Sequence, residues 1–237
     1  MYKQNEGDSA VNVYSVSLQG EILDAPENAD LLIEFVGDSI TCGYGNMVEF
    51  GLVATNRITD GYQAYGTKTA RLLDADWSNV SKSGGAMIKK EGMTNAHIPS
   101  VYKQQSYQKT AKYDFSRTAD IVVINLGTND SGLLKEVTDL SQKYEIFMDA
   151  TRSFVNDVLE LNGEDTKIVF AFGLMTEPNL FDNAYMELVE EYKAKGIETH
   201  YCRLKPNTDG DAEHPSVAGG AVAAEDLANF IKRFVLK

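Results

Sequence analysis

From residue 31 onward, the chain alternates short apolar runs with longer stretches whose apolar residues recur at helical spacing. The apolar runs predict buried strands at residues 31–36, 77–80, 121–125, 167–172 and 199–203. The amphipathic stretches predict helices at residues 62–73, 145–161, 184–195 and 216–235. Strands and helices that alternate in this way form a parallel sheet covered by helices on both faces. The pattern therefore predicts an α/β fold, a three-layer α/β/α sandwich with a central, mainly parallel five-stranded sheet.

Two segments depart from this alternation. Residues 11–18 alternate apolar and polar side chains, as a half-buried strand does. Residues 1–30 are therefore expected to form a peripheral strand and linker beside a main domain at 31–237. Residues 81–118 form a long polar stretch rich in Lys, Gln and Ser, expected to be a loop, with a short helix around residues 100–109 as the alternative. Long loops in compact domains are often functional, so this stretch is expected to contribute to function.

Composition narrows the classes of partner. A chain of 237 residues, 43% of them apolar, can bury a substantial core within one α/β domain. The formal net charge of -13 disfavours nucleic acid and anionic membrane surfaces, which are bound through clustered Lys and Arg. Neutral substrates fit this negative net charge better than polyanions do. No apolar run approaches the ~18 residues of a transmembrane helix, and the first residues lack the apolar core of a signal peptide.

The two cysteines, Cys42 and Cys202, show no metal-ligand spacing. They are expected to be free, buried thiols, with a disulfide between them as the alternative. Either state leaves the cellular compartment open.

A candidate nucleophile follows the first predicted strand of the main domain. There the sequence turns through Gly37, Asp38 and Ser39, which would place the serine at the carboxyl end of a strand, where open α/β sheets bind their ligands. A serine hydroxyl needs a base to become nucleophilic. Of the three histidines, His200 lies in a predicted strand and His97 in the long polar stretch. His214 precedes the last helix at another strand-to-helix junction, so it is the favoured base.

The base in turn needs an acceptor that fixes its tautomer. Asp211 is the candidate, with Asp209 and Glu213 as nearby rivals, although acidic residues before a helix commonly act as caps. Donors for a developing oxyanion are the Ser39 N–H, a glycine N–H at Gly84 or its neighbour, and the Asn129 side-chain amide.

Three other residues near these turns have expected roles. Asp38 and Asp130 are expected to support the turns by hydrogen bonds. Tyr44 lies close to the serine in the sequence and could stack on a sugar.

Four blocks now stand in order along the chain: Gly37-Asp38-Ser39-Ile40, Gly84, Gly127-Thr128-Asn129-Asp130 and Asp211-Ala212-Glu213-His214. This order resembles the SGNH, or GDSL-like, hydrolases over residues 31–237. Residues 33–46, 113–117 and 123–130 are more narrowly similar to the catalytic domain of carbohydrate esterase family 2, the acetylxylan esterase-like enzymes.

The resemblance implies a function and a parent architecture. Members of that family remove acetyl groups from xylan or other polysaccharides, are generally secreted, and pair an N-terminal β-sandwich with the hydrolase domain. The opening residues are similar to the end of that sandwich, so such a domain is an expected partner in a longer parent. The resemblance implies no metal and no cofactor.

By resemblance, each site residue also takes a role. Ser39 is the nucleophile, His214 the base, and Gly84 and Asn129 are oxyanion donors. Ala212 stands where some members keep an aspartate, which leaves open whether Asp211, Asp209 or no carboxylate completes the site.

The expected function is a serine esterase that deacetylates carbohydrates through an acyl-enzyme, with an acetylated carbohydrate as its partner. One alternative is an SGNH lipase or arylesterase acting on lipid or aryl esters. Another is a non-catalytic sugar-binding or flavodoxin-like module, which would bind without turnover.

Overall fold

The computed structural model describes residues 13–49, 51, 58–107, 109–175 and 180–237. Its central sheet contains β1 (Leu32–Gly37), β2 (Asp76–Ser81), β5 (Ile121–Asn125), β6 (Lys167–Phe172) and β7 (Thr199–Arg203). The strand order is β2-β1-β5-β6-β7, and every neighbouring pair is parallel. The predicted five-stranded parallel sheet is confirmed, and each strand matches its predicted range to within one residue.

The register of the sheet brings three strand ends to one edge. Gly37 at the end of β1 pairs with Ser81 at the end of β2 and with Asn125 at the end of β5. The loops that follow these strands therefore start side by side, although they are far apart in the sequence.

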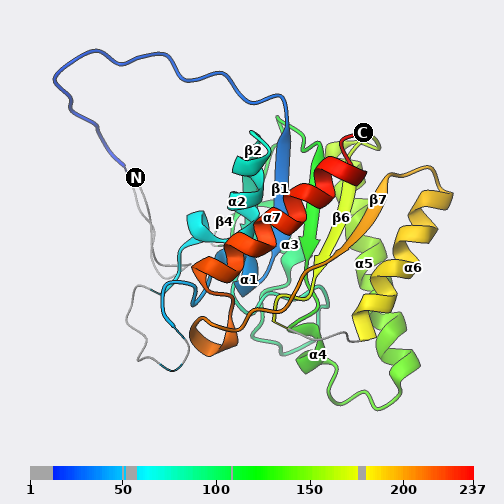
Figure 1. The fold of residues 1–237 in the computed structure, drawn as a ribbon. Coiled ribbons are helices and arrows are strands. Elements are labelled where there is room, and N and C mark those ends of the chain that lie inside the picture. Colours follow the sequence, from blue (N-terminus) through cyan, green and yellow to red (C-terminus); the bar gives the residue numbers. More distant parts are fainter. Residues whose placement is uncertain (1–12, 50, 52–57, 108, 176–179) are drawn as a thin grey trace.

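Helices cover both faces of the sheet, as Figure 1 shows. The described helices are α1 (Ser39–Cys42), α2 (Tyr65–Leu72), α3 (Ile98–Tyr102), α4 (Asp130–Leu133), α5 (Leu140–Asn162), α6 (Leu180–Ala194) and α7 (Val217–Phe234), with short 3-10 helices at Gly61–Gln63 and Asp211–Glu213. Helices α2 and α7 pack on one face, and α3, α5 and α6 pack on the other.

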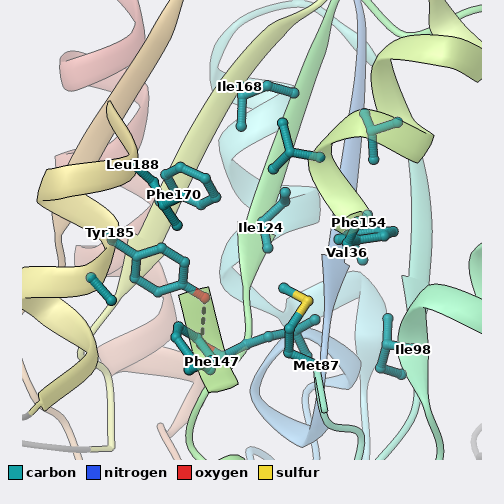
Figure 2. Close-up of a cluster of buried hydrophobic side chains, with 14 of the residues drawn as sticks. Val36, Met87, Ile98, Ile124, Phe147, Phe154, Ile168, Phe170, Tyr185 and Leu188 are labelled. Atoms are coloured by element: carbon teal, nitrogen blue, oxygen red, sulfur yellow. Dashed lines mark hydrogen bonds between the residues drawn. The ribbon is translucent and has the colours of Figure 1, made fainter. Parts of the chain in front are cut away.

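Alternating residues of each central strand feed two separate cores. In β5, Val122 and Ile124 face the α5–α6 side, whereas Ile121 and Val123 face the α2–α7 side. Figure 2 shows the first of these cores, in which Phe147 of α5 and Tyr185 of α6 pack near Phe170 of β6. The Tyr185 hydroxyl donates to the carbonyl oxygen of Leu126 at 2.8 Å, which ties α6 to the end of β5.

Capping residues explain where the helices differ from their predicted ranges. Helix α5 begins five residues early because Asp139 accepts hydrogen bonds from the N–H groups of Ser141 and Gln142. The predicted helix at 62–73 is divided into a 3-10 turn capped by Asp60 and the shorter α2.

Of the expectations for the irregular segments, the N-terminal strand was wrong and the short helix was partly right. No strand is formed within residues 13–18, whose apolar side chains are exposed, and residues 13–30 run outside the layers (Figure 1); residues 11 and 12 lie outside the described part. The alternative of a short helix is confirmed in part. Helix α3 covers Ile98–Tyr102, so it overlaps the predicted 100–109 but begins two residues earlier, where Pro99 suits a first helical turn. It leads into an antiparallel hairpin of β3 (Gln104–Ser106) and β4 (Lys109–Lys112).

Both cysteines are buried and neither forms a disulfide, in agreement with the expectation. Among the described helices, none has the length and apolar character needed to cross a bilayer.

Glu34 is an unusual residue for the middle of a buried strand. Its carboxyl lies on the α3 side of β1, where Oε1 accepts a hydrogen bond from Ser78 Oγ at 3.0 Å and Tyr102 of α3 lies beside it. Burial raises the pKa of this carboxyl above its ordinary value, and hydrogen bonds from Tyr102 and Ser78 oppose the shift.

We expect Glu34→Gln to stabilise the fold near neutral pH. A carboxyl whose pKa is higher in the folded state than in the unfolded state costs stability as pH rises above the unfolded value. The neutral amide removes this cost, so Tm should rise by roughly 2–4 °C at pH 8 and change little below pH 4. Thermal unfolding followed by circular dichroism at both pH values checks this, and an equal shift at both would contradict it.

Candidate active site

Ser39 is presented by a sharp turn between β1 and α1. Asp38 caps α1, because its Oδ1 accepts a hydrogen bond from the Ile40 N–H at 3.0 Å. Gly37 allows the turn, since a Cβ there would lie 2.0 Å from Thr41 Oγ1. Ser39 is therefore the first residue of α1, at the carboxyl edge of the sheet.

His214 reaches this serine from the loop between β7 and α7. Its Nε2 lies 2.8 Å from Ser39 Oγ, although the two residues are 175 positions apart. Ser216 Oγ accepts from the Gly219 N–H at 3.1 Å, which caps α7 immediately after the histidine. The two side chains that the sequence selected are thus in hydrogen-bonding contact.

The other ring nitrogen of His214 fixes its tautomer. Nδ1 lies 3.1 Å from the carbonyl oxygen of Asp211 and 3.0 Å from that of Ala212. A carbonyl oxygen only accepts, so Nδ1 must carry the proton. In the neutral ring Nε2 is then an acceptor, and the Ser39 hydroxyl donates to it. This is the arrangement in which a histidine can remove a proton from serine.

Asp211 therefore contacts the ring through its main chain. Both hydrogen bonds of Nδ1 are made to main-chain oxygens. The carboxylate acts on the ring only through its charge, which partly opposes the lowering of the imidazole pKa by burial. The rival Asp209 instead accepts a hydrogen bond from Asn207 Nδ2 at 2.7 Å.

The turn that carries these carbonyls has an unusual backbone. Ala212 and Glu213 have φ angles of 50° and 61°, in the left-handed region that L-residues other than Asn and Asp rarely adopt. Neither residue type signals such a turn, so sequence reasoning missed the role of the two carbonyl oxygens.

Asn129 lies in the turn after β5 and contacts both neighbouring loops. Its Nδ2 donates to the carbonyl oxygen of Gly85 at 2.9 Å and lies 3.3 Å from Asp38 Oδ2. Gly84 precedes that carbonyl, has φ of 73°, and accepts a hydrogen bond on its own oxygen from Asn95 Nδ2 at 2.7 Å. The two expected oxyanion residues therefore belong to loops that meet beside Asp38 and Ser39.

Asp130 is fully buried next to Asn129. Its Oδ1 accepts from the Ile88 N–H at 2.7 Å and its Oδ2 from the Met87 N–H at 3.1 Å. Burial raises the pKa of this carboxyl to about 6, and the backbone hydrogen bonds oppose the shift.

Tyr44 packs against the histidine. The two ring centroids are 4.9 Å apart, with the planes tilted by 59°. The following Gly45 has φ of 70°, and a Cβ there would lie 2.6 Å from the carbonyl oxygen of Asp211. Tyr44 and Gly45 thus hold the histidine loop in place.

The remaining histidines have other partners. His97 Nδ1 is 2.7 Å from Ser100 Oγ, and His200 Nε2 is 3.1 Å from Glu198 Oε1. Within the described ranges, no group of three or more His, Cys, Asp and Glu side chains is placed to hold a metal ion.

An open cavity lies beside the histidine loop. It has a volume of about 630 Å³ and is lined in part by Asn46, Met47, Glu49 and Asp209. Asn46 belongs to the loop that follows Tyr44, so the cavity borders the same loops that hold His214.

Comparison with known proteins identifies the family. The model of the GDSL-like Lipase/Acylhydrolase family matches residues 35–222, well over half of the chain. The chain belongs to this family.

This GDSL-like chain resembles two curated esterases. It is 31% identical over 226 residues to "Cellulase/esterase CelE" of Acetivibrio thermocellus, a match that covers 90% of the chain and 27% of that protein. It is 24% identical over 198 residues to "Acetylxylan esterase / glucomannan deacetylase" of Cellvibrio japonicus, covering 76% and 55%. The chain thus spans about a quarter and about half of the lengths of these two relatives.

A solved structure extends the similarity to the fold. A family two carbohydrate esterase from Clostridium thermocellum in complex with cellohexaose superposes with a TM-score of 0.78 and 28% identity, covering 90% of the chain and 67% of that structure. The SGNH-type fold and the resemblance to family 2 carbohydrate esterases are confirmed.

We expect Asp211→Ala to keep most of the hydrolytic activity of this family member. The carbonyl oxygens that hold Nδ1 are main-chain atoms and remain, whereas a carboxylate that bonded to Nδ1 would be worth up to about 10⁴ in kcat. A loss below about tenfold in kcat for p-nitrophenyl acetate is the expected result. His214→Ala is the control, and an equal loss in both variants would show that the carboxylate is essential.

We expect the acid limb of the activity profile to have its midpoint below pH 6.5. Burial lowers the pKa of His214 from its ordinary 6.5, opposed by the hydrogen bonds to Asp211 and Ala212. The base works only when neutral, so kcat/KM should fall as pH falls through this lowered pKa. A pH profile of kcat/KM measures it, and a midpoint above 6.5 would contradict the result.

Proposed function

We infer that this chain is a serine esterase that removes O-acetyl groups from carbohydrates. The observation that carries the proposal is the 2.8 Å contact between Ser39 Oγ and a His214 ring whose tautomer is set by main-chain oxygens. Family membership and the similarity to carbohydrate esterases support the same reaction class.

Ser39 is the nucleophile and His214 the general base. Ser39 Oγ attacks the acetyl carbonyl carbon while its proton passes to His214 Nε2. The tetrahedral intermediate then collapses, the bond to the sugar oxygen breaks, and His214 returns the proton to that oxygen. A water activated by His214 attacks the acetyl-serine and releases acetate.

The developing oxyanion is stabilised by the Ser39 and Gly84 N–H groups and by Asn129 Nδ2. The hydrogen bond from Asn129 to Gly85 is short, whereas the contact to Asp38 at 3.3 Å is long. The Asn129 N–H that points toward Asp38 is therefore the one available to donate to the oxyanion. Asp211 completes the site through its carbonyl and its charge, so the catalytic unit is a serine–histidine pair.

The carbohydrate occupies the open cavity beside the histidine loop. Its lining combines the apolar Met47 with the carboxylates of Glu49 and Asp209, which suits sugar rings and their hydroxyl groups. Tyr44 serves the histidine by packing against it. If the substrate is a polysaccharide, the enzyme works outside the cytoplasm, because such a polymer cannot enter the cell.

We expect Ser39→Ala to abolish acetate release. Loss of the nucleophile should lower kcat by about 10⁴-fold or more without altering the fold, since the change removes one oxygen atom and the helix that begins at Ser39 is capped by Asp38. Acetate released from acetylated xylan, acetylated glucomannan and p-nitrophenyl acetate is measured for the wild type and for Ser39→Ala, with circular dichroism as the folding control.

The choice of ester distinguishes the alternatives. Short acetyl esters of sugars should be preferred over acyl chains longer than butyrate. A preference for long acyl chains would instead indicate a lipase or arylesterase, and binding of sugar without turnover would indicate a binding module.

A further inference from the structure

One buried carboxylate beside the site has no part in the reaction derived above. Asp130 is completely buried, whereas its neighbour Asn129 reaches the oxyanion region. Its two oxygens accept hydrogen bonds from the consecutive N–H groups of Met87 and Ile88, 43 and 42 positions away in the sequence.

These two N–H groups lie in the segment that carries Gly84. This segment, residues 82–88, leaves the end of β2 and is called the glycine arm below. It has a local turn, since the Gly85 N–H donates to the Lys82 carbonyl oxygen at 2.8 Å. From the turn after β5 and the start of α4, it is held by Asn129 at the Gly85 carbonyl and by Asp130 at the N–H groups of Met87 and Ile88.

The other side of the glycine arm is fixed by backbone pairing. Ala86 donates to the Ala96 carbonyl oxygen at 2.9 Å and accepts from the Ile98 N–H at 3.0 Å. The hydrogen bonds to Asp130 involve the next two residues of the arm. The arm is therefore held on one side by residues 96–98 and on the other by Asp130.

The chemistry of Asp130 suits a residue that orients the N–H groups of the glycine arm better than one that only stabilises the fold. Burying a carboxylate is costly unless it is hydrogen-bonded. A carboxylate has two oxygens that each accept here from one N–H, whereas an asparagine amide has one acceptor oxygen and an NH₂ group that only donates. Oxyanion donors are effective only when their positions are fixed before the reaction.

We propose that Asp130 is a positioning residue that holds the glycine arm so that the Gly84 N–H faces the oxyanion beside Asn129. This proposal rests on the assignment of Ser39, Gly84 and Asn129 in the proposed function. Asp130 touches neither substrate nor the reacting atoms, and acts through the Met87 and Ile88 N–H groups.

The kinetic consequence is specific. Acylation and deacylation both pass through a tetrahedral oxyanion in the same hole, so a displaced arm should slow both steps by a similar factor. The ratio of the two rate constants, and with it KM, then stays nearly constant while kcat falls.

The test compares Asp130→Asn with Asp182→Asn. Asp182 is also buried, but it lies on α6 with Arg203 and Tyr201 as partners, away from the glycine arm. Asp130→Asn should lower kcat by about 10- to 100-fold with little change in KM. Asp182→Asn should keep kcat within about twofold even where it lowers Tm. Equal kcat in wild type and Asp130→Asn would overturn the proposal.

A double-mutant cycle with Asn129→Ala provides a second readout. Asn129 also holds the glycine arm, through the Gly85 carbonyl oxygen, so the arm is already loosened in Asn129→Ala and Asp130→Asn should then cost less than about threefold in kcat. Full additivity of the two losses would overturn the proposal.

The wild-type protein provides a test that does not depend on a variant folding. The Asp130 pKa of about 6 lies in an accessible range. In an NMR pH titration, the amide chemical shifts of Met87, Ile88 and Gly84 should all change with a midpoint equal to the Asp130 pKa. The ring signals of His214 report the titration of the histidine separately. Asp38 and Tyr185, which also face this region, are followed in the same spectra. A Gly84 amide chemical shift that does not change as Asp130 titrates would overturn the proposal.

Failure of the proposed function would look different. A Ser39→Ala variant that keeps its activity would refute the site itself. An inactive Ser39→Ala beside a fully active Asp130→Asn would leave the site intact and refute only the positioning role.

Discussion

The orientation of one imidazole ring depends on two main-chain carbonyl oxygens. The oxygens of Asp211 and Ala212 can only accept, so they fix the proton of His214 on Nδ1 and leave Nε2 as the acceptor for Ser39. A carboxylate would do the same and would add charge. Here the positive φ angles of Ala212 and Glu213 aim the carbonyls instead, so backbone geometry takes over a task usually given to a side chain.

The candidate site also depends on buried carboxylates that connect loops. Asp38 caps the helix that starts at Ser39 and lies within reach of Asn129. Asp130 joins the end of β5 to the glycine arm through two N–H groups. Because parallel strands end together at one edge, the loops that follow them meet there without any covalent link. The hydrogen bonds of Asp38 and Asp130 fix the positions of these loops relative to one another.

Several features could be predicted because they depend on local sequence. The apolar runs gave the five strands, since a buried strand needs little beyond apolar side chains between two turns. Ser39 and His214 could be selected because each stands at a strand-to-helix junction. The start of α5 was predicted five residues late, because its cap Asp139 precedes several polar residues that hide the helical pattern. Residues 13–18 alternate like a strand but have no strand partner in the described chain.

The sequence by itself determined the layers, the strands and the side chains that can do chemistry, because burial patterns and residue types are written along the chain. Only the tertiary structure decided which atoms meet. It brought the Asp211 carbonyl oxygen to His214 and the Asp130 carboxylate to Met87 and Ile88. Contacts between main-chain atoms, or across 42 residues, leave no pattern in residue types, since any residue carries the same carbonyl and N–H groups.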